Sequence, residues 1–335
     1  MSESPLLDVV GLTTRFATER GEVTAVDDVS FSIGSGEIVG LVGESGCGKS
    51  VTASSIMRLL DERYTSYGGE VVLGGTDLLA LPERRMRKER GRSVSMVFQD
   101  PMTALNPVYT IENQLIEAIR AHRTISRREA SAIALDLLEQ VGIPDARNRM
   151  RAYPHQLSGG MRQRVVIAMA LSSQPRLLIA DEPTTALDVT IQAQILELML
   201  ALRAEYDTGV VLITHDLGVV AQTCDRVLVM YLGQIIEDAP VGELFRQPYH
   251  PYTIGLLGAT PSVDADSADE LQVIPGRVPS LHDVPVGCRF AARCAFATQQ
   301  CLDDPPPLED VDGVHKVRCW NYRTVIASQE VTHVA

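Results

Sequence analysis

The sequence contains no apolar run of the roughly 18 residues that a helix needs to cross a bilayer. Its longest apolar runs are short, and Val165 to Leu171 and Val227 to Leu232 are typical of them. The first residues, Met1 to Pro5, show neither the basic region nor the apolar region of a secretory signal. We therefore expect a cytoplasmic protein that has no membrane-spanning helix.

The chain has fewer basic than acidic residues. The chain has 30 Lys and Arg against 43 Asp and Glu, which gives a net charge of −13. Because phosphate backbones are bound by basic surfaces, we expect no nucleic-acid partner. The six cysteines could form disulfides, but without an export signal we expect core thiols or metal ligands in a reducing cytosol. No internal repeat is present, and 335 residues suit one large domain plus a smaller one.

Short apolar runs with helical patterns between them indicate the buried parallel strands of an α/β fold. These runs are Ile38 to Val42, Leu177 to Ala180 and Val210 to Thr214. Alternating segments around 6–16 and 25–33 predict antiparallel strands beside that core. Ser126 and Glu129 form a capping box at the start of an amphipathic helix, whose apolar stripe is Ala130, Ile133, Ala134, Leu137, Leu138 and Val141. The small, acidic stretch from Pro261 to Glu270 predicts a linker, with a domain boundary near residue 260.

The most specific motif is Gly43-Glu-Ser-Gly-Cys-Gly48-Lys49-Ser50, which matches G-x-x-x-x-G-K-[ST]. It follows a predicted strand and opens an apolar helix through Ile56 and Leu60, which is the context of a P-loop. Its glycines let backbone N–H groups surround phosphate oxygens, Lys49 can neutralise the β- and γ-phosphates, and Ser50 can bind Mg²⁺. We expect Cys47 to be a small packing residue. The expected ATP contacts here are Gly43, Glu44, Ser45, Gly46, Cys47, Gly48, Lys49, Ser50 and Val51.

Polar residues follow two further predicted strands. Asp181 comes at the carboxyl end of the strand from Leu177, where it can hold Mg²⁺ directly or through water. Glu182 is placed next to it, and we expect it to be the general base that activates the attacking water. His215 follows the strand from Val210 and is expected to make a catalytic contact, because ligands collect at this edge of such sheets.

The segment Leu157-Ser-Gly-Gly-Met-Arg-Gln-Arg164 narrows the choice among P-loop enzymes. It precedes Asp181 by about twenty residues and begins a predicted helix through Ser173. Together with Gln99 after the strand 95–98, Ala186-Leu187-Asp188 and His215, it resembles the nucleotide-binding subunit of ABC transporters over residues 6 to 255.

That resemblance implies ATP hydrolysis between two subunits stacked head to tail. Ser158, Gly159 and Gly160 would then face the γ-phosphate of ATP bound to the partner, and Asp188 would organise the dimer interface. Gln99 would sense Mg²⁺ and the attacking water, so that Ser50, Gln99 and Asp181 form the Mg²⁺ set. Phe16 would stack on adenine, with a core role as the alternative. The expected catalytic residues are Lys49, Gln99, Glu182 and His215.

Four cysteines lie near the C-terminus, at Cys288, Cys294, Cys301 and Cys319. Their spacing contains neither the C-x₂₋₄-C of zinc ribbons nor the C-x₂-C-x₂-C of bacterial ferredoxins. From spacing alone we predict a tetrathiolate site, and unliganded thiols remain the alternative. Three neighbouring arginines, at 289, 293 and 318, could offset the negative charge of a thiolate-bound cluster.

Further segments resemble the peptide and nickel importer branch of the ABC ATPases, and within it the dipeptide and oligopeptide permease subunits. They are Pro248-Tyr-His-Pro-Tyr-Thr253, Val278-Pro-Ser-Leu281, Gly287-Cys-Arg-Phe290, Arg293-Cys294 and His315 to Trp320. This resemblance implies a [4Fe-4S] cluster on the four cysteines, with Zn²⁺ as the alternative, and it gives the cluster a structural role.

Taken together, we expect an α/β ABC ATPase domain at 1–258, with a mixed sheet core, an antiparallel β subdomain and a helical subdomain at about 100–172. A small Cys-rich extension is expected at 259–335. The resemblance implies a translocase ATPase on the cytoplasmic face of the membrane, which is peripheral and drives di- or oligopeptide import. Its expected partners are two permease subunits, a second related ATPase subunit in a heterodimer, and a solute-binding protein. Nickel, glutathione or another small solute is the alternative cargo. A sugar importer ATPase and a soluble, non-transport ABC ATPase are the less favoured functions.

Overall fold

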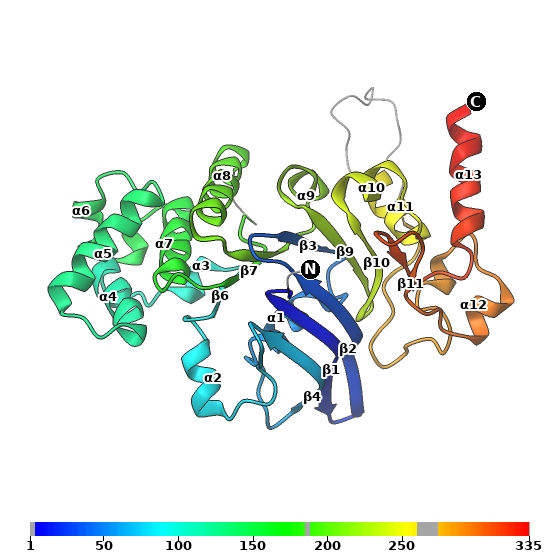
Figure 1. Cartoon of the computed structure of the whole chain (residues 1–335), viewed down its shortest axis with the longest axis horizontal. Coiled ribbons are helices and arrows are strands. Elements are labelled where there is room, and N and C mark those ends of the chain that lie inside the picture. The colour runs from blue at the N-terminus through cyan, green and yellow to red at the C-terminus, as the bar shows by residue number, and fades with distance from the viewer. Residues whose placement is uncertain (1–3, 185–187, 260–273, 335) are drawn as a thin grey trace. The chain divides into compact units, whose positions relative to one another are not determined.

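A computed structural model describes residues 4–184, 188–259 and 274–334 of the chain (Figure 1). The chain divides into two compact units. We call the described residues of 8–32, 38–72, 213–259 and 274–334 the P-loop unit, and those of 4–7, 33–37, 73–184 and 188–212 the helical unit. No helix in the described part of the chain has the length and apolar character needed to span a membrane. The predicted linker from Pro261 to Glu270 lies outside the described residues.

The P-loop unit contains a sheet with the strand order β2-β1-β4, formed by β1 (Leu7–Thr18), β2 (Gly21–Ile33) and β4 (Thr65–Leu73). Two residues join β1 to β2, so these strands run antiparallel. Along β2 the side chains alternate between the core and solvent, as a half-buried strand requires. The predicted antiparallel segments are therefore confirmed, with slightly longer bounds.

A second run of strands in this unit carries the P-loop. β3 (Ile38–Val42) pairs in parallel with β9 (Arg226–Tyr231), and β9 pairs antiparallel with β10 (Gln234–Pro240). β12 (Lys316–Val317) then pairs with β10, and β11 (Glu309–Asp310) with β12. Every residue of β3 is buried, as expected for a central parallel strand.

The first helix of the P-loop unit begins within the P-loop, at Lys49. The predicted helix after the P-loop ends sooner than expected, at Ile56, because Arg58 adopts a left-handed conformation (φ 49°) that stops the helix before Leu60. The described helices are α1 (Lys49–Ile56), α9 (Leu217–Thr223), α10 (Val241–Arg246), α11 (Pro251–Gly258), α12 (Gln299–Asp303) and α13 (Tyr322–Val334), with a 3₁₀ turn η2 at Ala291–Arg293.

The helical unit has the strand order β8-β7-β6. β6 (Val94–Val97) and β7 (Leu177–Asp181) pair in parallel, and β8 (Gly209–Ile213) stops one residue before the predicted end at Thr214. Its other elements are β5 (Thr76–Asp77), α2 (Glu83–Glu89), α3 (Pro101–Ala104), α4 (Ile111–His122), α5 (Arg127–Gln140), α6 (Ala146–Arg149), η1 (Pro154–Gln156), α7 (Gly159–Leu171) and α8 (Val189–Tyr206).

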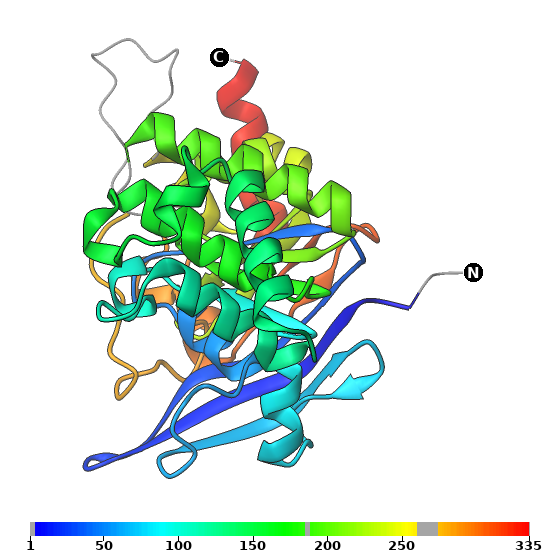
Figure 2. The same ribbon diagram turned by 90° about the vertical axis from the view of Figure 1, so that its left-hand side faces the viewer.

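Helices α4, α5 and α7 pack against one another in this unit (Figure 2). The predicted capping box of α5 is confirmed, since Ser126 Oγ accepts the Glu129 N–H at 3.2 Å and the Glu129 carboxylate accepts the Ser126 N–H at 2.8 Å. Its inner face buries Ala130, Ala134, Leu137 and Leu138. This stripe positions the helices and takes no part in chemistry.

Candidate functional site

The P-loop lies between the end of β3 and the start of α1. Gly43, Gly46 and Gly48 have φ values of 148°, 81° and 109°, which favour glycine. A Cβ atom at Gly43 would come within 2.2 Å of the Met230 carbonyl oxygen. The backbone therefore approaches β9 as closely as only glycine permits, and this contact fixes the curl that exposes N–H groups to an anion.

Lys49 lies across the mouth of this loop. Its side chain is buried, and Nζ donates hydrogen bonds to the carbonyl oxygens of Gly43 at 2.8 Å and Glu44 at 3.0 Å. Ser50 is exposed at the start of α1. Cys47 is fully buried, and burial raises the pKa of its thiol despite the nearby Lys49 ammonium. Cys47 therefore packs as a neutral thiol, as the sequence indicates.

Two other predicted site residues lie at the surface of the P-loop unit. His215 is exposed in the turn between β8 and α9, next to Asp216, whose carboxylate accepts the Val219 N–H at 3.1 Å and caps α9. Phe16 is half-buried on β1, so it is not a full core residue. Both side chains thus keep a face toward solvent.

In the helical unit, the structure brings two predicted catalytic residues together. Gln99 Nε2 donates a hydrogen bond to Glu182 Oε2 at 2.8 Å. The backbone of Glu182 is left-handed, with φ of 46°, which is uncommon for a residue other than glycine. Asp181, one residue earlier at the end of β7, is buried. Backbone conformations of this kind persist at functional sites, where the surroundings over-determine them.

The Leu157–Gly160 segment forms the start of α7. Ser158 is the N-cap residue, and its Oγ accepts the Met161 N–H at 3.3 Å. A Cβ atom at Gly160 would come within 2.7 Å of Ile191 Cγ2 on α8, so glycine permits this close packing. Asp188 caps α8 by accepting the Ile191 N–H at 3.0 Å. Ala186 and Leu187, which belong to the same predicted motif, lie outside the described residues.

A pocket on the helical unit opens beside α4. Its lining contains both polar and apolar side chains. Three exposed apolar side chains, Met102, Val108 and Tyr109, precede α4 in the chain. The lining residues are Tyr109, Asn113, Ile116, Glu117, Arg120, Ala121 and Arg127. Sequence reasoning could not find this surface, because its residues are of types common in any helix or loop.

The four C-terminal cysteines, Cys288, Cys294, Cys301 and Cys319, line one small pocket. Burial raises the pKa of Cys288, and it raises the pKa of Cys294 to about 11 and of Cys319 to about 12. The thiols of Cys288, Cys294 and Cys319 are therefore protonated near neutral pH. Within residues 4–184, 188–259 and 274–334, no three His, Cys, Asp or Glu side chains are arranged to hold a metal ion. The structure thus gathers the four sulfurs without the close ligand set that we expected.

The expectation that neighbouring arginines offset a cluster's charge is wrong for two of the three. Arg293 forms an ion pair with Glu44 of the P-loop, and Arg289 forms one with Asp27 on β2. Each buried guanidinium is therefore neutralised by a carboxylate instead of a thiolate. Arg318 donates to the Ile235 and Pro306 carbonyl oxygens and still lies close enough to Cys288 to interact with it electrostatically.

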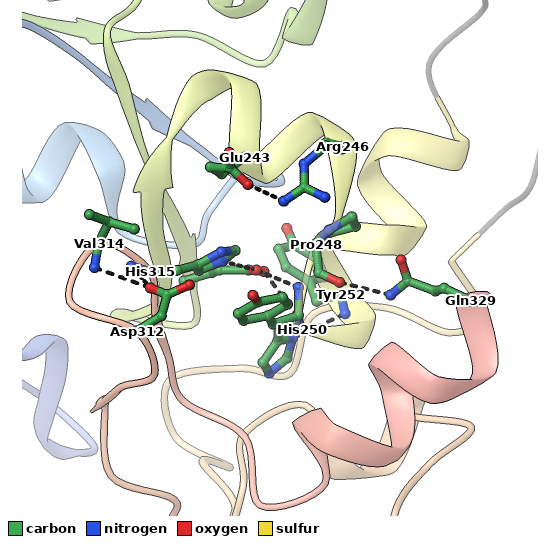
Figure 3. A network of polar contacts seen from close by, with 11 residues as sticks. Glu243, Arg246, Pro248, His250, Tyr252, Asp312, Val314, His315 and Gln329 are labelled. Carbon is green, nitrogen blue, oxygen red and sulfur yellow. Dashed lines mark hydrogen bonds and ion pairs between the residues drawn. The ribbon is translucent and has the colours of Figure 1, made fainter.

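A buried polar network joins the end of the chain to the turn before α11 (Figure 3). Glu237 is fully buried, and its carboxylate contacts His315 Nε2 at 2.7 Å and accepts the backbone N–H groups of Tyr249 and His250. His250 Nδ1 accepts the Tyr252 N–H at 3.0 Å and caps α11. Burial lowers the pKa of His250 to about 3, so the ring is neutral. His250 thus has a structural place and no catalytic geometry.

Two family models match the chain. Residues 26–185 match the model described as ABC transporter, and residues 236–301 match the C-terminal region of oligopeptide/dipeptide transporters. A Brucella melitensis protein named for peptide import and ATP binding is 53% identical over 98% of this chain and 100% of its own length. A Sinorhizobium fredii protein named as a peptide ABC transporter ATP-binding protein is 52% identical over 96% of each chain.

Solved structures support the same grouping. A dimeric ATP-binding cassette in a post-hydrolysis state, bound to ADP and Pi, superimposes with a TM-score of 0.63 at 28% identity. The match covers 70% of this chain and 98% of that one. A component of an ABC transporter complex from Clostridium perfringens gives a TM-score of 0.62 at 26% identity, covering 73% of this chain and 92% of that one.

Proposed function

Since the chain belongs to the ABC transporter family of ATPases, we propose that it is the energy-coupling subunit of an importer for di- and oligopeptides. The observation that carries this proposal is that similarity to peptide-import proteins extends over 98% of the chain. It includes residues 236–301, the part that matches oligopeptide and dipeptide transporters. That part also counts against a sugar importer ATPase, which the sequence alone left open.

Hydrolysis is assigned to Glu182 as general base. The hydrogen bond from Gln99 fixes the orientation of the Glu182 carboxylate, so its oxygen can accept a proton from water aligned on the γ-phosphate. The amide of Gln99 would shift when the water or Mg²⁺ binds. This movement would signal to a membrane partner whether ATP is bound. His215 is assigned a contact with the γ-phosphate.

Phosphate binding is assigned to the P-loop from Gly43 to Val51. Lys49 would exchange its two carbonyl partners for oxygens of the β- and γ-phosphates. Ser50, Gln99 and Asp181 are assigned to Mg²⁺, because they offer the hydroxyl, amide and carboxylate oxygens that this ion prefers. The ion would supply charge neutralisation on the phosphates. Phe16, which keeps a solvent-facing side, is assigned to the adenine ring.

A second subunit would complete each site. A serine hydroxyl has one donor and two acceptor positions, so Ser158 can accept from Met161 and still donate to a phosphate oxygen. Gly159 and Gly160 add N–H groups at the helix start, where anions are favoured. Asp188 would stand at the same interface. We propose a heterodimer with a related ATPase subunit.

The membrane partner would be a pair of permease chains, which this chain would bind at the cytoplasmic face of the membrane. An extracytoplasmic solute-binding protein would belong to the same system. The pocket beside α4 and the exposed side chains of Met102, Val108 and Tyr109 support a docking site for a permease helix. Of these three side chains Tyr109 also lines the pocket, and exposed apolar side chains at a pocket are typical of interaction surfaces. The protein itself would be peripheral to the membrane.

The four cysteines are proposed to hold a [4Fe-4S] cluster, with Zn²⁺ as the alternative. Four thiol donors around one pocket match either group in number and donor type, and the sulfurs must come closer together to hold it. When bound, the group would cross-link the C-terminal segment. To bind it, Cys288, Cys294 and Cys319 must each lose a proton that burial now retains.

The test is reconstitution of the chain with its permeases and second ATPase subunit in liposomes. We expect ATP hydrolysis to rise at least tenfold over the isolated chain, because the missing donors then face the γ-phosphate. Uptake of labelled dipeptide should depend on the binding protein. Nickel and glutathione serve as competing cargoes. An isolated, monomeric chain that hydrolyses ATP as fast as the complex would contradict the composite-site proposal, and uptake of nickel alone would reassign the cargo.

A further inference from the structure

The P-loop is in direct contact with the C-terminal segment through Glu44. Arg293 Nη1 donates to Glu44 Oε2 at 2.7 Å, and Nη2 donates to Glu44 Oε1 at 3.1 Å. These two parallel bonds form a bidentate pair between residues 249 positions apart. The Arg293 side chain is 4% exposed, whereas that of Glu44 is 31% exposed. The cation is therefore buried, and its carboxylate partner reaches in from the loop.

Arg293 has little freedom to leave this position. Its Nε donates to the Pro275 carbonyl oxygen at 2.8 Å, and its guanidinium lies 5.7 Å from the Tyr231 ring centroid and 5.8 Å from that of Phe290. Such stacking holds the planar group in one orientation. The guanidinium of Arg293 therefore meets the Glu44 carboxylate from a fixed position.

A second contact reaches the same P-loop residue from α11. The Tyr252 hydroxyl accepts the backbone N–H of Glu44 at 2.7 Å. Tyr252 is fully buried, and its helix begins at the turn held by Glu237, His315 and His250 (Figure 3). Gln329 of α13 donates to Pro248 at 2.8 Å in the same turn. The peptide unit of Glu44 is therefore held on both its N–H and its side chain.

A third contact supports the far end of the loop. The Gly233 N–H, in the β9–β10 hairpin, donates to the Cys47 carbonyl oxygen at 2.7 Å. Arg289 donates to the carbonyl oxygen of Leu232 in that hairpin, and Leu232 has a left-handed backbone with φ of 43°. Arg289 and Arg293 thus support the two ends of the P-loop, and both lie next to cysteines of the shared pocket.

We infer that Arg293 is a positioning residue of the ATP site, acting through Glu44, so that the C-terminal segment sets the affinity of this chain for nucleotide. The carbonyl oxygen of Glu44 is also a partner of Lys49. The carbonyl oxygen of Gly43, which shares a peptide unit with the held Glu44 N–H, is the other carbonyl partner of Lys49. Holding Glu44 therefore fixes where Lys49 rests and where the following N–H groups point. We expect the backbone N–H groups of the loop to bind phosphate in the ground state as well as in the transition state, so the contact should act on the Kd and KM for ATP more than on kcat.

The test measures binding of a fluorescent ATP analogue with Mg²⁺ to the full chain. We expect Arg293→Gln and Glu44→Gln each to weaken binding about tenfold, as loss of a charge-assisted hydrogen bond does. The double variant should bind no more weakly than the weaker single variant, because both changes remove one interaction. Arg293→Lys keeps the charge and loses the bidentate geometry, so it should restore part of the affinity.

The matched control is Arg226→Gln, which breaks the partly buried pair with Asp238 in the same unit. It should lower the melting temperature without changing the Kd for nucleotide. If Arg293→Gln fails to fold because it leaves Glu44 unpaired, the Glu44→Gln variant and the double variant carry the test. Wild-type affinity in these two variants would overturn the inference. So would fully additive losses, or a fall in kcat of the assembled transporter at unchanged KM.

Discussion

His250 makes the C-terminal part of the P-loop unit sensitive to acid. Its pKa falls from an ordinary 6.5 to about 3 in the folded chain, because the ring is completely buried. The folded protein therefore keeps His250 neutral, whereas the unfolded chain takes up a proton once the pH falls below 6.5. Stability from this group is fully present above pH 6.5 and is lost progressively as the pH falls toward 3.

The size of the effect follows from the separation of the two pKa values. Between pH 7 and pH 5 the unfolded chain gains a proton on His250 that the folded chain does not, which lowers the free energy of unfolding by about 2 kcal/mol. The matched variant is His250→Asn. An Asn side chain can still accept the Tyr252 N–H at the start of α11, but it does not titrate in this range.

The measurement is urea unfolding at pH 7 and at pH 5, monitored by the fluorescence of Trp320. This is the single tryptophan of the chain, and it lines the same pocket as His250. The wild-type chain should lose about 2 kcal/mol more than His250→Asn over this interval. Equal losses in the two proteins would refute the reasoning, since they would show that His250 binds no extra proton on unfolding.

Three further predictions concern the chemistry. Glu182→Gln should leave ATP binding intact and slow turnover of the assembled transporter about 10²-fold or more, because the general base is lost; near-normal hydrolysis would remove Glu182 from that role. Gly160→Ala should slow turnover about 10²-fold at unchanged ATP affinity of the isolated chain, since the new Cβ collides with Ile191 and shifts the start of α7; a weakened affinity would place the effect elsewhere. Cys294→Ser should abolish bound iron and its visible absorbance, and a colourless, iron-free wild-type protein purified without oxygen would exclude the cluster.

Much of the fold could be predicted because its signals are local. The run from Ile38 to Val42 is β3 as expected, and the capping box at Ser126 starts α5. Gln99 and Glu182 could be placed together in advance, since each follows a strand and β6 and β7 are parallel neighbours. The early end of α1 could not be predicted, because it depends on the left-handed conformation of Arg58, which arginine rarely adopts.

The contacts between the C-terminal segment and the P-loop could not be predicted from the sequence. Arginines next to cysteines suggest thiolate partners, but Arg293 pairs with a carboxylate 249 positions away. Which of the chain's many acidic residues meets a given arginine depends on tertiary packing, and no local pattern encodes it. Glu44 is expected to contact nucleotide through its place in the P-loop motif, and nothing in that motif indicates that its side chain pairs with Arg293.

The short strand β12 has a consequence for the solubility of the isolated chain. It pairs with β10 at Glu237 and Asp238 and so occupies hydrogen-bonding groups that would otherwise face solvent. An uncovered edge strand is a template on which a second chain can add, which is a common route to aggregation. The appended segment thus also shields the fold from self-association, and shortened versions of this chain that end before residue 274 should be handled as aggregation-prone.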